Sequence, residues 1–221
     1  MRKLSTGVTK PSRATLDDGA LRHDAAIQSV NHCEEVGTRG GRRERECDSY
    51  RYNLAAYELG KLFGLRFIPP CVEREFGGRD AAFTWWIDGA MTFAEMKAQG
   101  LSPPDGVAWN HQQFVVGIFD ELIYNTDRHS ANLLVDPQWR VWMIDHTRAF
   151  RVLKRLRNPG MLARLRMPPA MMSALESLTS ETLDVCCRRY LSSEEIKGVL
   201  ARRDSIVGLF SSATTAASPA P

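Results

Sequence analysis

The sequence predicts an α+β protein with a small lobe of strands and one helix, followed by a mainly helical lobe. Three observations predict this fold class: apolar runs separated by turn residues in the first hundred positions, helical spacing of apolar residues from position 109 onward, and one further hairpin pattern around 136–139. The chain has 221 residues, 43% of them apolar, which is enough for one medium domain or two small lobes.

Charge and hydropathy exclude several classes of function. The formal net charge is +3 and the basic residues are scattered, apart from a run at 39–45, so we do not expect a nucleic-acid partner. No stretch approaches the roughly 20 apolar residues of a membrane span. The residues after Met1-Arg2-Lys3 are polar, unlike the apolar core of a signal peptide. We therefore expect a cytoplasmic protein without integral membrane association.

The cysteines show no metal-binding pattern. They form no C-x-x-C pair, and two of them are neighbours that could not easily bridge one another. This favours free thiols in a reducing compartment and argues against a structural zinc site. The five positions are Cys33, Cys47, Cys71, Cys186 and Cys187.

The first predicted element is a β-hairpin within residues 7–30. The turn signal Asp17-Asp18-Gly19 lies between the short runs 14–16 and 25–27, which read as strands. Residues 31–47 are charged, contain glycine and lack a clear period, so we expect a loop there.

A helix is expected next. Asp48 or Ser49 would cap it, and apolar residues at 55, 59, 62 and 63 would share one face. Gly64 supplies a stop signal directly after this pattern.

A second hairpin completes the small lobe. Residues 67–73 and 81–87 read as strands on either side of the turn Gly77-Gly78. The chain then appears irregular through Pro103-Pro104. We expect the small lobe and its connector to span residues 1–104.

The second lobe begins with a long buried helix, because apolar residues recur at helical spacing from Trp109 to Ile123. Residues 159–210 indicate two or three more helices, with N-caps at Ser180 and Ser192. We expect this lobe to span 105–210. The last residues, 211–221, contain only Ser, Ala, Thr and Pro and are expected to form a disordered tail.

A hairpin near the middle of the chain brings polar residues to its open end. Residues 136–139 are the predicted turn, and we expect Val135 to pair with Arg140 across it. This antiparallel register places Asn132 opposite Met143.

Asp127, Asn132 and Asp145 then carry chemistry suited to phosphoryl transfer. Asp145 lies two residues beyond Met143 toward the open end, and Asp127 precedes the first strand on the loop that leaves the buried helix. Hard oxygen ligands suit Mg²⁺, so Asn132 and Asp145 are candidate metal ligands, while Asp127 would accept a proton from an attacking hydroxyl. Protein kinases use a catalytic Asp followed after four residues by Asn, and Asp127 and Asn132 have that spacing.

These residues carry a family resemblance. The string Asp127-Arg128-His129-x-x-Asn132, followed after a short hairpin by Ile144-Asp145, resembles the catalytic and metal-binding loops of the phosphoinositide 3- and 4-kinase-like branch of the kinase superfamily. That branch includes HipA-like bacterial kinases and the secretory-pathway casein kinases. Nearly the whole chain except the tail is similar to a group of bacterial proteins with this fold, through Gly-Val-Thr-Lys-Pro-x-Arg at 7–13, Asp-Ser-Tyr-Arg-Tyr-Asn-Leu-Ala-Ala-Tyr-Glu-Leu at 48–59, Pro-Pro-x-Val-Glu-Arg at 69–74 and Ile-Asp-His-Thr-Arg-Ala-Phe at 144–150.

The resemblance implies a two-lobed, protein-kinase-like fold with ATP between the lobes and Mg²⁺ on Asn132 and Asp145. Asp127 would be the catalytic base, and Arg128 would position the catalytic loop. His129 would orient the loop or a phosphate, or pack as a structural histidine beside Asp145.

The resemblance also implies a small-lobe lysine that pairs with the nucleotide phosphates. Gln28 stands on the strand where related kinases place this lysine, and Asn53 stands near the place of the helix glutamate that partners it. The candidate lysine is therefore Lys10, beside Gly7. Possible replacements are Arg13 or Arg22 for the lysine and Glu46 or Glu58 for the glutamate, and Trp86–Asp88 would form the hinge that contacts adenine.

Two functions from different classes follow. One is an ATP- and Mg²⁺-dependent kinase that phosphorylates a protein or small-molecule hydroxyl. The other is a pseudokinase that binds nucleotide or a partner protein without transferring phosphate, which Gln28 and Asn53 favour. Adenylyl transfer through a flipped nucleotide is a third, less favoured alternative.

Overall fold

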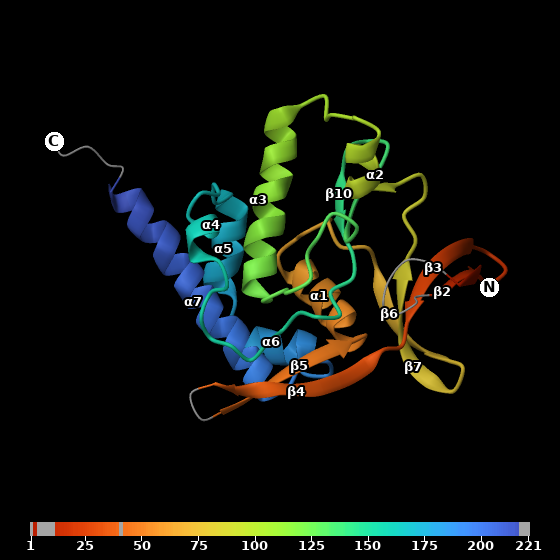
Figure 1. Cartoon of the computed structure of the whole chain (residues 1–221), viewed down its shortest axis with the longest axis horizontal. Coiled ribbons are helices and arrows are strands. Elements are labelled where there is room, and N and C mark those ends of the chain that lie inside the picture. Colours follow the sequence, from red (N-terminus) through yellow and green to blue (C-terminus); the bar gives the residue numbers. More distant parts are fainter. Residues whose placement is uncertain (1, 4–11, 40–41, 217–221) are drawn as a thin grey trace.

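The computed structural model describes residues 2–3, 12–39 and 42–216, and shows a sheet at one end and helices at the other (Figure 1). Five antiparallel strands form the main sheet, in the order β1-β2-β3-β7-β6. Their bounds are β1 (Arg2–Lys3), β2 (Ser12–Asp17), β3 (Arg22–Gln28), β6 (Cys71–Phe76) and β7 (Arg79–Trp85). The helices are α1 (Arg51–Leu62), α2 (Phe93–Ala98), α3 (Gly106–Leu122), α4 (Pro159–Leu162), α5 (Pro169–Ser177), α6 (Ser180–Cys187) and α7 (Ser193–Ala216).

Both predicted hairpins of this sheet form at their turn residues. Asp18 closes the first turn, since its carboxylate accepts hydrogen bonds from the Ala20 and Leu21 amides. Gly77 and Gly78 both adopt positive φ, as a two-residue hairpin turn requires. The second hairpin lies closer to its turn than predicted, at Cys71–Phe76 and Arg79–Trp85, because a two-residue turn lets pairing continue to the residues that flank it.

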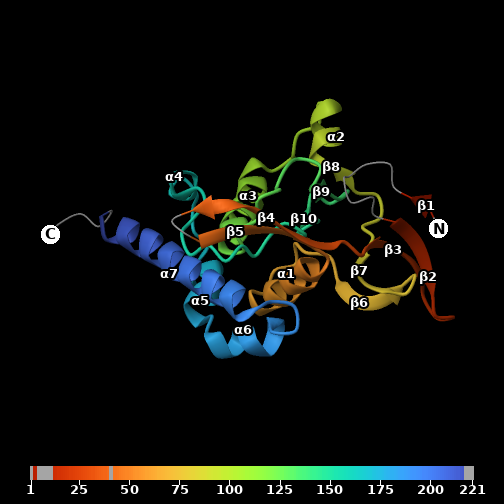
Figure 2. The same cartoon turned by 60° about the horizontal axis from the view of Figure 1, so that its bottom comes forward.

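The prediction of a loop at 31–47 is wrong. Strands β4 (Asn31–Arg39) and β5 (Arg42–Ser49) form a separate antiparallel hairpin. It extends away from the five-stranded sheet along the helical side (Figure 2). The side chains of Glu34, Glu35 and Arg45 are exposed, and the sequence of these strands has no alternation of apolar and polar residues that could reveal the hairpin.

The prediction of free cysteines is wrong for four of the five. Cys33 and Cys47 are paired across β4 and β5 in a disulfide of 2.08 Å, and the neighbours Cys186 and Cys187 are also bonded. Cys71 is a free, buried thiol. The sequence-based argument for a reducing compartment therefore loses its basis.

Helix α1 belongs to the main hydrophobic core together with the helices of the second lobe. Neither of the two predicted residues forms the side-chain hydrogen bond of an N-cap. Ser49 Oγ accepts a 3.3 Å hydrogen bond from the Arg51 amide, and the Asp48 carboxylate pairs with Arg148. Gly64, at φ 62°, follows the helix as predicted. Leu62 is exposed and does not belong to the apolar face, whereas Tyr52, Ala55, Ala56, Leu59 and Phe63 are buried in the main core.

The stretch predicted to be irregular before Pro103 contains strand β8 (Met91–Thr92) and helix α2. Thr92 and Glu95 form a capping box, in which each side chain bonds the backbone of the other residue. The Thr-x-x-Glu spacing is a start signal for a helix, and the sequence therefore did contain evidence for α2.

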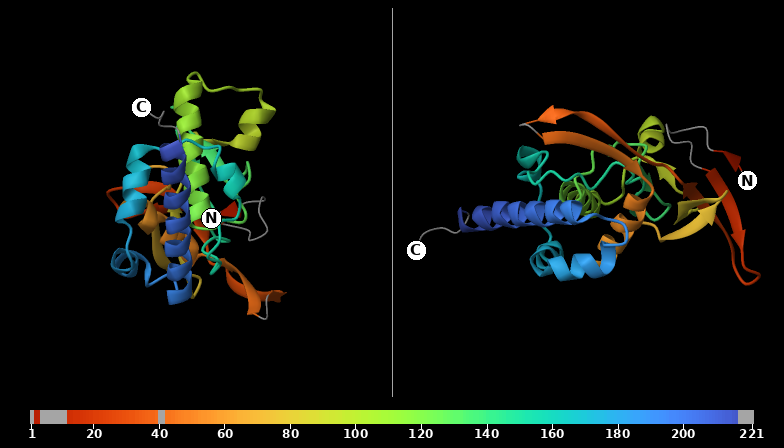
Figure 3. Two further views of the ribbon diagram at one scale, coloured as in Figure 1. Left: turned by 90° about the vertical axis from the view of Figure 1, so that its left-hand side faces the viewer. Right: turned by 90° about the horizontal axis from the view of Figure 1, so that it is seen from below.

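The helical lobe differs from the prediction in three details. Four helices, α4 to α7, follow residue 158 instead of two or three. Ser192 and Glu195 form the predicted capping box of α7, whereas α6 is capped by Thr179 rather than Ser180. Helix α7 lies along α3 and continues to Ala216 (Figure 3), so residues 211–216 are helical rather than disordered. Residues 217–221 lie outside the described residues. No helix in the described ranges is long and apolar enough to cross a membrane.

Arg202 of α7 is fully buried and joins three parts of the helical lobe. Its Nε donates to the carbonyl of Leu122 at 2.8 Å, and its Nη1 donates to the carbonyls of Arg151 and Leu153. The end of α3 and the segment after residue 150 are therefore held against α7 by one guanidinium.

Replacing Arg202 with Met should lower the free energy of unfolding by about 3 kcal/mol, because one buried and two partly buried carbonyls lose their donor. Urea denaturation measures this loss. Arg188→Met is the control, since Arg188 makes only exposed contacts, an ion pair with Asp184 and a hydrogen bond to Ser193, and their loss should cost at most about 1 kcal/mol. Equal losses in the two variants would contradict the role assigned to Arg202.

Candidate active site

The buried side chain of Arg128 holds the predicted catalytic loop together. Its guanidinium forms two hydrogen bonds with the carboxylate of Asp120 in α3, at 2.8 and 3.1 Å. Its Nη1 donates to the carbonyls of Asn132 and Ile144, at 2.6 and 2.7 Å. Arg128 therefore joins α3, the loop and the chain just before Asp145, and it acts as a positioning residue.

Two asparagines orient the backbone around Asp127. Asn125 is fully buried, donates to Asp120 at 3.0 Å and accepts a hydrogen bond from the Asp127 amide at 3.1 Å. Asn132 Nδ2 donates to the Asp127 carbonyl at 3.0 Å. The side-chain oxygen of Asn132 and the half-buried carboxylate of Asp127 accept no hydrogen bond from another described residue.

The hairpin after this loop has a register one residue away from the prediction. Strands β9 (Leu133–Val135) and β10 (Val141–Met143) pair Val135 with Val141 rather than with Arg140. Asn132 therefore lies opposite Ile144, whose amide donates to the Asn132 carbonyl at 3.2 Å. The turn includes Arg140 as an additional residue, because the Asp136 carboxylate accepts hydrogen bonds from the amides of Gln138 and Arg140. Trp139 within the turn has a φ of 61°.

Asp145 stands directly after this pairing and contacts the small lobe. Its φ is 55°, a region that non-glycine residues seldom occupy outside tight turns and functional sites. Its Oδ1 accepts hydrogen bonds from Gln28 of β3 at 3.1 Å and from Thr147 at 3.0 Å. Its Oδ2 accepts none from the described residues and is available to a ligand.

A neutral amide pair joins strand β3 to helix α1 beside Asp145. Strand β3 ends in Ala-Ala-Ile-Gln, which differs from the kinase pattern Val-Ala-Ile-Lys at its first position, Ala25, and at its last, Gln28. Asn53 of α1 donates to Gln28 Oε1 at 2.8 Å and accepts from the His146 amide at 2.7 Å. Gln28 and Asn53 thus form a hydrogen-bonded pair that carries no charge.

Arg13 and Trp86, which were also predicted to bind nucleotide, make their contacts with other described residues and not with this site. Arg13 pairs with Asp24 at 2.6 Å and its guanidinium lies 4.1 Å from the centre of the Trp86 ring. The Trp86 amide donates to the Asp24 carbonyl, and its own carbonyl bonds the His23 ring. These contacts use the Trp86 backbone that would bind adenine at a hinge. Gly7 and Lys10 lie outside the described residues.

The histidine beside Asp145 is His146 rather than His129. His129 is exposed, and its Nδ1 accepts the Ala131 amide. His146 is buried and its Nε2 has no partner among the described residues. Burial, followed by the charge of Arg128, lowers the pKa of His146 well below its usual value, so its ring is neutral at pH 7.

Arg148 places a cation close to both carboxylates. Its carbonyl accepts hydrogen bonds from the Thr126 amide and hydroxyl, which fixes it beside the start of the catalytic loop. Its Nε donates to Asp48 of β5 at 3.1 Å. The hydrogen bond to Asp48, followed by the charges of Asp48, Asp127 and Asp145, raises the pKa of the Arg148 guanidinium.

The free oxygens fit a magnesium ion that also binds phosphate. Asn132 Oδ1 and Asp145 Oδ2 are hard donors, and Mg²⁺ is commonly held by one or two protein oxygens together with water and substrate phosphates. The described residues contain no cluster of three or more His, Cys, Asp and Glu side chains that would bind a metal without such additional ligands.

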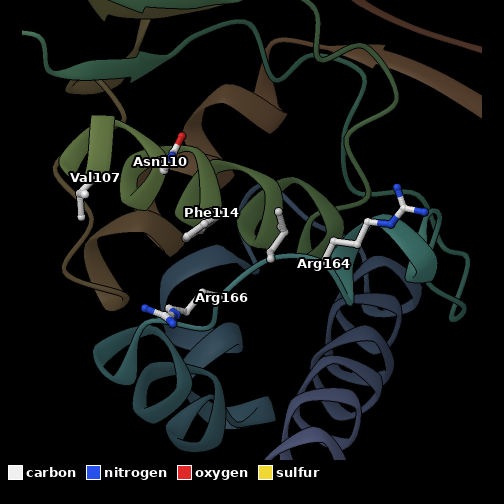
Figure 4. Close-up of a pocket in the computed structure, with 6 residues that line it drawn as sticks. Val107, Asn110, Phe114, Arg164 and Arg166 are labelled. Atoms are coloured by element: carbon white, nitrogen blue, oxygen red, sulfur yellow. The ribbon is translucent and has the colours of Figure 1, made fainter. Parts of the chain in front are cut away.

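Two hollows lie in the helical lobe, away from these residues. One has a volume of about 550 Å³ and lies between α3 and the segment after α4, with Phe114 and the two arginines Arg164 and Arg166 on its wall (Figure 4). The other, of about 760 Å³, lies between residues 64–67, the start of α3 and the β9–β10 turn. Asp127, Asn132 and Asp145 line neither of them.

Solved structures of kinases have the same fold. The proinflammatory kinase CtkA of Helicobacter pylori superimposes with a TM-score of 0.66 at 7% identity, over 99% of this chain and 96% of that protein. The Golgi casein kinase superimposes with a TM-score of 0.62 at 12% identity, over 99% of this chain and 72% of that protein. No protein-family model and no curated protein matches the sequence. The chain therefore has a protein-kinase-like fold.

The sequence did not assign several residues that build this site. Asp120 and Asn125 were missed. Asp120 lies within an apolar helical run, and because a carboxylate is rarely buried without a partner, its position indicates a buried polar contact. Asn53 was noted only as a departure from the kinase pattern. Its bond to Gln28 spans 25 positions, and no local pattern predicts such a contact.

Replacing His146 with Phe should reduce the acid sensitivity of folding. The folded-state pKa of His146 lies below its unfolded value near 6.5, so its contribution to stability is present above that value and is lost as the pH falls. Between pH 7.5 and 5.0 the wild type should lose about 2 kcal/mol more than the variant, as measured by urea denaturation. Identical pH dependence would show that His146 is not buried in its neutral form.

Proposed function

We propose that this protein is an ATP- and Mg²⁺-dependent phosphotransferase of the phosphoinositide-kinase-like branch, acting on a protein or small-molecule hydroxyl. One observation carries the proposal: the buried network of Arg128 ties the backbone of the Asp127 loop, Asn132 and the residue before Asp145 into a single unit. The protein-kinase-like fold of the chain supports it, and Asp127 and Asn132 have the spacing that kinases use in their catalytic loop.

Each polar side chain has a role in this proposal. Asp127 accepts the proton of the acceptor hydroxyl or orients it, since its carboxylate is not engaged by another described residue. Asn132 and Asp145 hold the metal with their free oxygens. The bound metal neutralises the phosphate charge. Thr147 and Gln28 fix the other oxygen of Asp145 and so set the direction of the free one.

A second function is favoured by the neutral pair of Gln28 and Asn53. A pseudokinase with this pair would bind nucleotide or a partner protein without transferring phosphate, since it has no lysine on β3 to contact the phosphates. The two functions share the nucleotide and differ in whether the phosphate is transferred.

Replacing Asp127 with Asn should lower phosphate transfer by about 10²–10⁴-fold, because the variant keeps the shape of the side chain but cannot accept the proton. Asp145→Asn should abolish transfer by weakening the metal site. Incubation with ATP and Mg²⁺, followed by mass spectrometry of the protein and candidate acceptors, measures transfer and distinguishes a phosphoryl from an adenylyl group.

Asp136→Asn is the matched control for these two variants, since Asp136 shapes the β9–β10 turn and lies outside the proposed site. It should retain transfer. A wild-type protein that is thermally stabilised by ATP and Mg²⁺ without any turnover would support the pseudokinase and contradict the phosphotransferase.

The double variant Gln28→Lys, Asn53→Glu should raise the affinity for ATP by about tenfold or more over the wild type. It restores an ion pair at positions already in hydrogen-bond contact, and the lysine adds a charge toward the phosphates. Each single variant should be less stable than the double variant, because it leaves one charge without its designed partner, at a half-buried position for Gln28→Lys and at a buried position for Asn53→Glu. Calorimetric titration with ATP and thermal denaturation measure the two effects.

A further inference from the structure

Of the small-lobe residues predicted to contact phosphate, neither Gln28 nor Arg13 offers a free cation at this site. Gln28 is neutral and is engaged by Asn53 and Asp145. Arg13 is committed to Asp24 and to the Trp86 ring. A nucleotide with three or four negative charges would therefore lie near Asp127 and Asp145 without a β3 cation between them.

The large lobe has other cations near the site, but two of them are already engaged. Arg128 directs its hydrogen bonds to Asp120 and to two backbone carbonyls. Arg151 pairs with Glu46 at 3.0 Å and donates to the Arg45 carbonyl. Their guanidinium groups hold protein segments together and are not directed at a ligand.

Arg148 differs from both. Its side chain is 41% exposed, and only its Nε bonds a described residue, the carboxylate of Asp48. Both terminal nitrogens remain available within the described residues. Its backbone is fixed by two hydrogen bonds from Thr126, the neighbour of Asp127, so the side chain starts from a defined point beside the catalytic loop. The charges of Asp127 and Asp145 contribute to the raised pKa of Arg148, which agrees with this placement.

We propose that Arg148 binds the nucleotide phosphates in this protein and provides, from the large lobe, the cation that kinases place on β3. The inference rests on the nucleotide-binding function proposed above. Asp48 holds the guanidinium in a ready orientation through Nε and leaves the two terminal nitrogens to form a fork with phosphate oxygens.

Affinities for adenosine, ADP and ATP in the presence of Mg²⁺, measured by calorimetric titration of the full chain, test this role. The quantity of interest is the gain in affinity from adenosine to ATP. Arg148→Met should reduce this gain about tenfold while the affinity for adenosine stays unchanged, because only the phosphate contact is lost. Arg148→Lys should keep part of the gain, since it retains the charge but not the fork.

Three control variants separate this role from others. Arg155→Met removes an exposed charge from the same segment and should keep the full gain. Asp48→Asn removes the charge of the ion pair but keeps a side-chain oxygen that can accept the Nε hydrogen bond and orient the guanidinium, so it should keep the gain. Lys10→Met tests the alternative lysine, and loss of the gain in this variant with its retention in Arg148→Met would overturn the proposal.

The remaining outcomes are equally decisive. Weaker binding of all three ligands by the same factor in both Arg148→Met and Asp48→Asn would show that Arg148 is only structural, and would overturn the proposal. A wild type that gains affinity from adenosine to ATP, with the gain unchanged in Arg148→Met, would also overturn it while nucleotide binding stands. A wild type that binds none of the three ligands would overturn both proposals.

Discussion

The ion pair between Arg128 and Asp120 is the interaction on which the whole site depends. Both side chains are about 90% buried, and the remaining donors of Arg128 are satisfied by two carbonyls. A buried pair of this kind tolerates poorly the loss of one partner, because the other charge is then left without compensation. Its value here is geometric: the positions of Asn132 and Asp145 are set by the same guanidinium that anchors the loop to α3.

The neutral link between Gln28 and Asn53 is compatible with an ordered site because α1 does not depend on it for its position. Helix α1 is part of the main core, and Tyr52 at its start donates to Glu195 of α7. Packing therefore holds Asn53 near Asp145 whether or not an ion pair is present. A helix that swings away from the active site would have to break this core, so we infer that any opening of the lobes occurs in the sheet rather than in α1.

The structural features that could be predicted from the sequence are those encoded by residues close together in the chain. Features that depend on contacts between distant residues were missed. The spacing of Asp127 and Asn132 and the Gly77-Gly78 turn were readable because each is encoded within a few residues. The β4–β5 hairpin was not, because its strands pair mainly with each other and carry no apolar face. The one-residue error at β9–β10 arose from the carboxylate of Asp136, which folds an additional residue into the turn, a detail that hydrophobic periodicity does not contain.

The charges around the cleft explain why a metal and a large-lobe arginine would act together in this protein. Asp127 and Asp145 are both carboxylates, and replacing the usual lysine by Gln28 removes one positive charge from their surroundings. Phosphates approaching this pair are repelled unless cations are already present, and repulsion is strongest where water is excluded. A metal on Asn132 and Asp145 would offset part of that charge. Arg148, whose carbonyl is bound by Thr126 next to Asp127, adds an exposed guanidinium. Nucleotide affinity in such a site depends more steeply on divalent cation and on salt than in a kinase with a buried lysine, because the cations that remain are the solvent-accessible ones.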